Sequence, residues 1–286
     1  LEQILSAGGK RIRPTLGLLI GNMLGAPEGK LVTLGAAVEL LHTATLVHDD
    51  LIDGSLLRRG MPTLNARWSP AATVLTGDFM FARAAKLAAE TDHIPLMNAF
   101  AETLATIVNG ELNQLFNSRG IINRENYYQR IYAKTASLFE MTAKAAAMIS
   151  PVGKSTVEAM RKLGYETGIA FQIVDDVLDF TGEQTTVGKP IGSDLLNGLV
   201  TLPAIYYADA HPDDEDVVSL AEGGWASQER MARLVDSIRK TDAIRKAMGE
   251  ANQHVELALQ SLEGFDPSQE REALENLAKF IVDRNV

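Results

Sequence analysis

The sequence predicts an all-α fold, with its 286 residues forming a single domain, 1–286, built as one large helical bundle around a central cavity. Apolar residues recur at three- and four-residue spacing over long stretches, which is typical of helices with one buried face. The strict alternation of half-buried strands is scarce. The chain is also long enough to bury a sizeable core.

Short breakers containing Gly, Pro, Ser or Asp separate the helical stretches. In chain order they are APEG (26–29), WSP (68–70), HIP (93–95), NSRG (117–120), SPVG (150–153), HPDD (211–214) and EGG (222–224). Ser155 and Glu158 have the spacing of a capping box and predict a helix that reaches Asp179. The Gly-rich segment 181–198 follows, and a loop of this length is expected to act as a lid.

Composition excludes several classes of function. The net charge of −10 and the pI near 5.1 argue against a nucleic-acid partner, which would need a basic face. Without cysteine the chain has no disulfide, thiol nucleophile or cysteine-ligated zinc. We find no signal peptide and no uninterrupted apolar run of about 18 residues, so we expect no transmembrane segment and a cytoplasmic location. The start at Leu1 suggests a truncated N-terminus.

Two aspartate clusters with DDxxD spacing give the strongest functional signal. They are Asp49, Asp50 and Asp53 in LVHDDLID, and Asp175, Asp176 and Asp179 in FQIVDDVLDF. Residues four apart share one face of a helix, and like charges placed there repel. Apolar neighbours raise that cost, because burial disfavours the ionised form. One such cluster is usually a solvated helix end, but two indicate hard cations that bridge to an anionic ligand.

Cationic residues stand near these clusters. GGKRIRP at 8–14 places Lys10 and Arg13 at a predicted helix N-terminus before Pro14, where backbone amides and the helix dipole favour anions. Solvated surface is the alternative interpretation. The other candidates are Arg58 and Arg59, with an exposed turn as the alternative, Lys134 with its neighbour Thr135, with a surface lysine as the alternative, and Lys189 in the expected lid.

The His48–Asp49 pair offers an alternative chemistry, that of a metal-dependent phosphohydrolase. Such a site needs a second histidine that converges on the same ion. His42 lies near the face of Asp49 and Asp53 but away from His48. The more economical interpretation of His48 is a helix histidine that is hydrogen-bonded locally.

Taken together, these residues resemble the trans-isoprenyl diphosphate synthases, the polyprenyl synthetase family. The resemblance runs through GGKRIRP (8–14), ELLHTATLVHDDLIDGSLLRRG (39–60), AKTASLF (133–139), GIAFQIVDDVLDF (168–180) and GKPIGSDLLNGLVTLP (188–203), in the family's order. It implies the isoprenoid synthase fold and transfer of an allylic group to isopentenyl diphosphate. It also implies a homodimer, and a further helix before residue 8.

The resemblance implies a role for each matching residue. The six aspartates would bind Mg²⁺, in a cluster of three ions, and thereby hold an allylic diphosphate. Lys10, Arg13, His42 and Arg59 would bind isopentenyl diphosphate, and Arg58, Lys134 and Lys189 the allylic diphosphate. Thr135 and Gln172 would lie near the reacting carbon. Family members often have a polar residue near position 199, where this chain has Leu199.

Two small residues near the first aspartate cluster bear on the length of the product chain. In short-chain relatives, aromatic residues near the first cluster close the pocket, whereas this chain has Ala44 and Thr45 there. The resemblance therefore implies a long all-trans product of about C30–C50 made from a geranyl, farnesyl or geranylgeranyl starter. The alternative is that both residues are small because another helix packs closely against them.

Other functions remain open. A short-chain farnesyl or geranylgeranyl diphosphate synthase would share every motif. A class I terpene cyclase ionises the same substrates, but should lack the GGKR and RRG residues. A non-catalytic partner subunit typically loses one aspartate motif, and a purely structural bundle would not explain either cluster.

Overall fold

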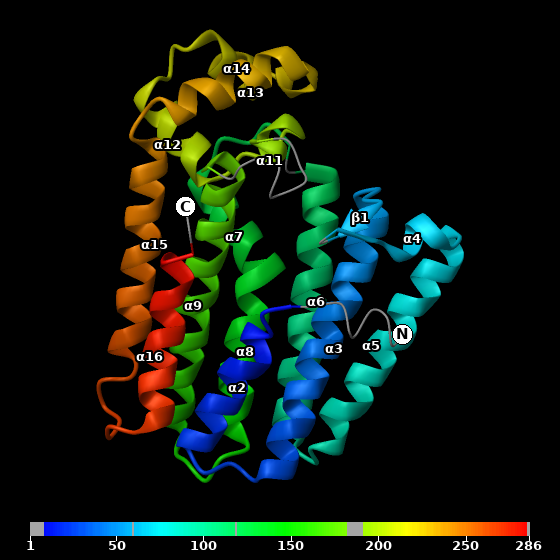
Figure 1. Cartoon of the computed structure of the whole chain (residues 1–286), viewed down its shortest axis with the longest axis vertical. Helices are drawn as coiled ribbons and strands as arrows, with labels where there is room; N and C mark the ends of the chain where they lie inside the picture. Colours follow the sequence, from blue (N-terminus) through cyan, green and yellow to red (C-terminus); the bar gives the residue numbers. More distant parts are fainter. Residues whose placement is uncertain (1–8, 59, 118, 182–190, 285–286) are drawn as a thin grey trace. The chain divides into compact units, whose positions relative to one another are not determined.

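The computed structural model describes residues 9–58, 60–117, 119–181 and 191–284. The chain is 78% helical, which confirms the all-α prediction (Figure 1). Within the described ranges, the extended structure consists of an antiparallel pair, β1 (Leu57–Arg58) with β2 (Met61–Pro62), and one isolated bridge between Arg119 and Leu199.

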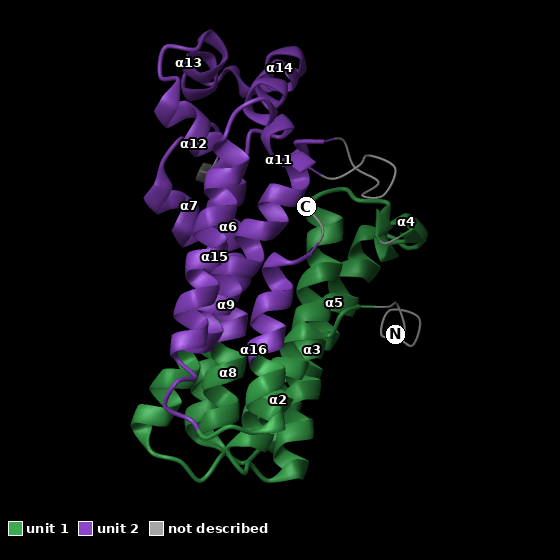
Figure 2. Ribbon diagram, turned by 60° about the vertical axis from the view of Figure 1, so that its left-hand side comes forward, with its two compact units in different colours: residues 1–103, 141–161, 266–274 green, residues 104–140, 162–265, 275–286 purple. Residues whose placement is uncertain are grey.

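The helices divide between two compact units (Figure 2). Unit 1 comprises residues 1–103, 141–161 and 266–274, and unit 2 comprises residues 104–140, 162–265 and 275–286. The helices with residues in both units are α6 (Ile94–Asn117), α8 (Ser137–Met148), α9 (Lys154–Thr181) and α16 (Gln269–Val282). The single domain and its central cavity stay predictions.

Unit 1 is built on α3, which packs along α5. Its complete helices are α2 (Ile12–Met23), α3 (Glu28–Ile52), α4 (Leu64–Arg67) and α5 (Pro70–Glu90). Pro14 lies in the first turn of α2, as predicted, and Pro70 opens α5, where its missing amide donor carries no penalty. Ala44 and Val47 of α3 form a small buried cluster with Met80 of α5.

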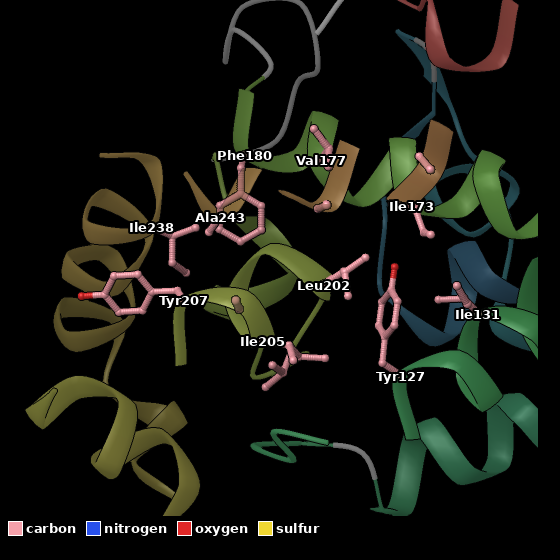
Figure 3. Close-up of a cluster of buried hydrophobic side chains, with 14 of the residues drawn as sticks. Tyr127, Ile131, Ile173, Val177, Phe180, Leu202, Ile205, Tyr207, Ile238 and Ala243 are labelled. Atoms are coloured by element: carbon pink, nitrogen blue, oxygen red, sulfur yellow. The ribbon is translucent and has the colours of Figure 1, made fainter. Parts of the chain in front are cut away.

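Unit 2 contains the larger core. Its complete elements are α7 (Arg124–Ile131), the π-helix η1 (Tyr132–Ala136), α11 (Ser193–Leu196), α12 (Leu202–Ala210), α13 (Glu215–Ala221), the 3₁₀-helix η2 (Gly224–Ala226), α14 (Gln228–Arg239) and α15 (Ala243–Gln260). Ile173, Val177 and Phe180 recur along one face of α9 and share a buried cluster with Leu202 and Ile205 of α12 (Figure 3).

The predicted breakers all lie at helix ends or between helices. The helix predicted to reach Asp179 exists as α9, but its capping box is misplaced. α9 begins at Lys154, and the amide of Val157 donates to the carbonyl of Gly153 at 3.2 Å, so Ser155 is already inside the first turn. Of the predicted lid, residues 182–190 lie outside the described residues, and the part that follows contains α11.

One described helix, α3, is long and apolar enough to cross a membrane, with a mean hydropathy of 1.4 over its most apolar window. This is weak evidence, because the core helices of soluble proteins pass the same test, and 44% of that window is buried. No membrane span is firmly indicated.

Candidate active site

The first aspartate cluster lies at the C-terminal end of α3. Asp49 and Asp50 are in its last turn, and Asp53 is the residue after the helix, with its amide donating to the carbonyl of Asp49 at 2.8 Å. The helix dipole disfavours negative charge at this end, and the last turn carries no basic residue. A cation would therefore relieve an electrostatic cost that the sequence builds into α3.

Arg58 supplies one such cation within unit 1. Its Nε donates to Oδ1 of Asp50 at 2.8 Å, and the Asp50 side chain is largely buried. Between the two residues the chain leaves α3 through Gly54, whose φ of 64° suits glycine, and the amide of Ser55 donates to the carbonyl of Asp50 at 2.9 Å. Arg58, a predicted diphosphate-binding residue, is thus hydrogen-bonded to Asp50, a predicted metal ligand. Arg59 lies outside the described residues.

The second cluster also lies at the C-terminal end of its helix, α9, again with no basic residue in the last turn. Asp179 accepts hydrogen bonds from the amide and the hydroxyl of Ser193 at 3.1 and 2.8 Å, and from the amide of Asp194 at 3.1 Å. These donors come from the start of α11. Asp175 accepts a hydrogen bond at 2.8 Å from Nη1 of Arg284, 109 positions along the chain.

Asp176 is the buried member of the second cluster. Its Oδ2 accepts from the hydroxyl of Tyr127 at 2.7 Å and its Oδ1 from Nε2 of Gln172 at 2.8 Å, while Gln172 Oε1 accepts from Thr135 Oγ1 at 2.6 Å. Burial, together with the nearby charge of Asp194, raises the pKa of Asp176 to about 7 despite these hydrogen bonds. A cation bound here would favour the ionised carboxylate.

Lys134 and Thr135 lie in η1, a single π-helical turn. Such turns are rare and occur often at functional sites. Nζ of Lys134 forms an ion pair with Glu111 Oε1 of α6 at 2.9 Å, which directs this half-buried lysine toward α6. The sequence pattern predicts both residues as candidates but contains no sign of the π-helical geometry.

Two glycines allow neighbouring helices to approach this turn closely. A Cβ atom on Gly110 of α6 would lie 2.5 Å from Cβ of Ala133, and one on Gly168 of α9 would lie 2.6 Å from Cα of Ala136. Neither position has room for a larger residue without movement of the backbone. The turn that carries Lys134 is therefore packed tightly on two sides.

Arg13 and His42 come together in unit 1. Nη1 of Arg13, on α2, donates to Nε2 of His42, on α3, at 3.2 Å. Arg11, two residues before Arg13, forms an ion pair with Glu39, which lies one turn before His42. Lys10 is exposed just before α2. The structure thus brings together two of the residues predicted to bind isopentenyl diphosphate.

His48 supports the local interpretation rather than the phosphohydrolase. Its Nε2 lies 3.1 Å from the carbonyl of Val74 on α5, which is donor geometry for the imidazole. The ring also packs edge-on against Phe81, with centroids 5.1 Å apart. His48 is therefore engaged with the adjacent helix.

Ala44 and Thr45 differ in their surroundings. Ala44 is fully buried against Val47 and Met80, which favours close helix packing as the reason for its small size. Thr45 is only half-buried, and its hydroxyl donates to the carbonyl of His42 at 2.7 Å. Their role in product length stays a prediction.

Two other positions bear on the predicted site. Lys189 lies outside the described residues. Leu199 is half-buried, and its amide donates to the carbonyl of Asp194 at 2.9 Å.

The donors fit a hard divalent cation by their chemistry. Each cluster offers three carboxylates, which are the ligands that Mg²⁺ prefers. In the described part of the chain, no three acidic or histidine side chains are already gathered closely enough to hold one ion. One aspartate of each cluster instead binds an arginine of its own unit, Asp50 with Arg58 and Asp175 with Arg284. Convergence of the two clusters stays a prediction.

Sequence reasoning missed four residues that contact the second cluster: Tyr127, Ser193, Asp194 and Arg284. Ser193 and Asp194 stand together in the motif GSDLLNG, whose polar residues were a usable signal. Tyr127 and Arg284 carry no local signal, because only the tertiary fold brings them to α9.

The comparisons with known proteins agree with these features. A profile of the polyprenyl synthetase family matches residues 1–238. The all-trans-nonaprenyl-diphosphate synthase (geranyl-diphosphate specific) of Rhodobacter capsulatus is 39% identical, over 99% of this chain and 87% of its own. Component 2 of the heptaprenyl diphosphate synthase of Geobacillus stearothermophilus is 36% identical, over 99% of this chain and 88% of its own.

Among solved structures, the polyprenyl synthase from Caulobacter crescentus CB15, complexed with calcium and isoprenyl diphosphate, superposes with a TM-score of 0.91. It is 36% identical, and the match covers 100% of this chain and 88% of the other.

Proposed function

The chain belongs to the polyprenyl synthetase family, and on that basis we propose that it condenses isopentenyl diphosphate with an allylic diphosphate to give an all-trans polyprenyl diphosphate of about C30–C50. Members of the family are Mg²⁺-dependent transferases. The observation that carries the proposal is the position of both aspartate clusters at helix C-termini, where bound cations offset an otherwise unfavourable charge.

The six aspartates hold three Mg²⁺ ions in this proposal. When bound, the ions neutralise the charge that grows on the departing diphosphate. The Caulobacter structure, which contains calcium and an isoprenyl diphosphate, supports a site of this chemistry. The Rhodobacter relative, named as a geranyl-diphosphate-specific nonaprenyl-diphosphate synthase, supports both the long product and the allylic starter.

The chain's own residues bind and orient the substrates. Arg58, Lys134 and Lys189 bind the allylic diphosphate, and the ion pairs of Arg58 and Lys134 place two of these cations beside carboxylates. Isopentenyl diphosphate is bound by Lys10, Arg13, His42 and Arg59. The contact between Arg13 and His42 supports a joint site.

The reacting carbon lies beside Thr135 and Gln172. Their mutual hydrogen bond fixes the Gln172 side chain, so that its amide donates to Asp176 while its oxygen accepts from Thr135. Apolar walls exclude water, which would otherwise trap the allylic cation. No strong base is required, because the departing diphosphate takes the proton lost from the adduct.

The proposal is tested by incubating the purified protein with farnesyl diphosphate, labelled isopentenyl diphosphate and Mg²⁺. Chromatography of the dephosphorylated products should show labelled chains of C30 or longer, and EDTA should abolish them. A ladder that ends at C15 or C20 would instead identify a short-chain synthase. Cyclic products would identify a terpene cyclase.

We also propose a homodimer. Val108, Leu112, Leu115 and Phe116 are exposed and recur on one face of α6 within unit 2, as expected of an apolar stripe covered by a partner. The alternative is a two-component enzyme, which the name of the Geobacillus relative suggests.

Light scattering coupled to size exclusion distinguishes these states. Leu112→Glu should convert a dimer to a monomer, whereas Val218→Glu, at a comparably exposed apolar residue on α13, should not. A wild-type protein that is monomeric and inactive alone would favour the two-component enzyme. We further propose a cytoplasmic location, which cell fractionation tests.

A further inference from the structure

Arg284 is a nearly buried cation on the second aspartate cluster. Its Nη1 donates to Oδ1 of Asp175 at 2.8 Å, its Nη2 to the carbonyl of Phe171 at 3.1 Å, and its Nε to the carbonyl of Ile281 at 3.1 Å. The guanidinium carbon also lies 4.1 Å from the centroid of the Phe171 ring. The arginine side chain is 8% exposed, whereas that of Asp175 is 39% exposed. The guanidinium is thus held in place while Asp175 remains accessible.

The position of Asp175 explains why a distant arginine is used. Asp175 lies four positions before Asp179 on α9, and like charges at this spacing share one helix face and repel. The last turn of α9 supplies no basic residue. Arg284 is two residues beyond the end of α16 and provides the missing positive charge.

We infer that Arg284 is a positioning residue that holds Asp175 in the metal-free enzyme and competes with Mg²⁺ for its carboxylate. This inference rests on the proposed role of Asp175 as a metal ligand. A guanidinium and a metal ion at the same carboxylate oxygen repel each other, because both are positively charged. Metal binding at Asp175 therefore displaces Nη1 of Arg284, while the carbonyls of Phe171 and Ile281 keep the arginine nearby.

The competition is reciprocal. If Arg284 lowers the affinity of Asp175 for Mg²⁺ by some factor, Mg²⁺ lowers the affinity of Arg284 for Asp175 by the same factor. Removing the arginine should therefore strengthen metal binding, whereas removing a residue that orients the ligand for metal should weaken it. The sign of the effect separates the two roles.

The test is a calorimetric titration of the full chain with Mg²⁺ at saturating inorganic pyrophosphate. For Arg284→Gln the half-saturating Mg²⁺ concentration should fall roughly two- to fivefold, the range expected when a part-exposed ion pair is removed. Arg284→Lys, which keeps the charge but has fewer donors, should give a smaller fall, and it serves if the glutamine variant does not fold. The matched control is Arg233→Gln, which removes an arginine paired with Asp216 elsewhere in unit 2 and should change nothing.

A second variant and a second readout complete the test. In the Asp175→Asn background, Arg284→Gln should no longer affect Mg²⁺ binding, because the shared carboxylate is gone. Hydrogen exchange at residues 281–284 should become faster when Mg²⁺ and pyrophosphate are added to the wild-type protein.

Three outcomes would overturn the inference. The first is unchanged or weaker Mg²⁺ binding in Arg284→Gln, and the second is unchanged or slower hydrogen exchange at residues 281–284 when Mg²⁺ and pyrophosphate are added to the wild-type protein. The third is weaker binding of pyrophosphate alone in Arg284→Gln. The last outcome would make Arg284 a diphosphate ligand instead. A wild-type protein that binds no Mg²⁺ would refute the proposed function itself, and is thereby distinguished from failure of this inference.

Discussion

Tyr127 donates its phenolic hydrogen to Oδ2 of Asp176 at 2.7 Å, in the interior of unit 2. Tyr127 is 1% exposed and Asp176 is 4% exposed. The hydroxyl of the adjacent Tyr128 instead donates a hydrogen bond to the carboxylate of Glu250 on α15. Two consecutive tyrosines of α7 therefore hold two different carboxylates, and only one of these belongs to the aspartate clusters.

Tyr127→Phe should raise the Mg²⁺ requirement or lower turnover by about 10- to 100-fold, the usual effect of removing a group that orients a metal ligand. Tyr128→Phe is the matched control: it also removes a phenolic hydroxyl, from the next residue of α7, and should leave turnover per folded molecule unchanged. Initial rates over a Mg²⁺ series check this, with circular dichroism to verify folding. Equal losses in the two variants would mean that both tyrosines act only through stability.

Thr45→Phe should shorten the product. Thr45 is one turn before Asp49 and only half-buried, so an aromatic ring can be accommodated in the path expected for the growing chain. Ala44→Phe is a poorer test, because Ala44 is fully buried against Met80 and overpacking would cost about 1–3 kcal/mol. Chromatography of the dephosphorylated products gives the readout. A Thr45→Phe enzyme with normal turnover and unchanged product length would place the path elsewhere.

Gly168→Ala should destabilise the protein by about 1–3 kcal/mol, because the new Cβ would meet the backbone of η1. Gly249→Ala is the matched control. Gly249 lies in α15 with open space around it, so the substitution should stabilise the helix by about 0.5–1 kcal/mol. Urea unfolding measures both. The packing argument fails if Gly168→Ala is as well tolerated as Gly249→Ala.

Glu250 should make stability depend on pH. Burial alone would raise the pKa of Glu250, but hydrogen bonds from Tyr128, Tyr206 and Arg124 outweigh it and hold that pKa below the ordinary value. A carboxylate with a lowered pKa stabilises the fold above the unfolded-state pKa. This contribution is lost as the pH falls through the folded-state pKa.

Glu250→Gln should therefore lower the free energy of unfolding by about 1–3 kcal/mol at pH 7, with the difference from wild type shrinking as the pH falls below about 4.5. Urea unfolding at several pH values measures this difference. Glu158→Gln, which removes an exposed carboxylate paired with Arg161, should cost less than about 0.5 kcal/mol. A difference for Glu250→Gln that stays constant with pH would exclude the ionised carboxylate as its cause.

Local pattern was enough to predict the main elements that carry the site. Apolar periodicity predicts the helices that contain Asp49 and Asp175, and Pro14 marks the start of α2. The cap at Ser155 is wrong because Gly153 occupies the capping position instead, a choice that the spacing of side chains does not reveal.

Long-range partners could not be predicted in this way. Arg284 reaches Asp175 across 109 positions, and Tyr127 reaches Asp176 across 49. Neither pair has a sequence spacing that indicates contact. The π-helical turn of Lys134 likewise packs closely against Gly110 and Gly168, which belong to other helices, and no local pattern indicates this contact.

The acidic ends of α3 and α9 have a consequence for the resting protein. Carboxylates at the C-terminal end of a helix lie at the negative end of its dipole, so each of these helix ends carries a charge that it disfavours. A divalent ion bound there would act as a C-terminal cap. Arrival of the charged substrate with its ions would then remove an electrostatic cost at two helix ends, and chelation would restore that cost.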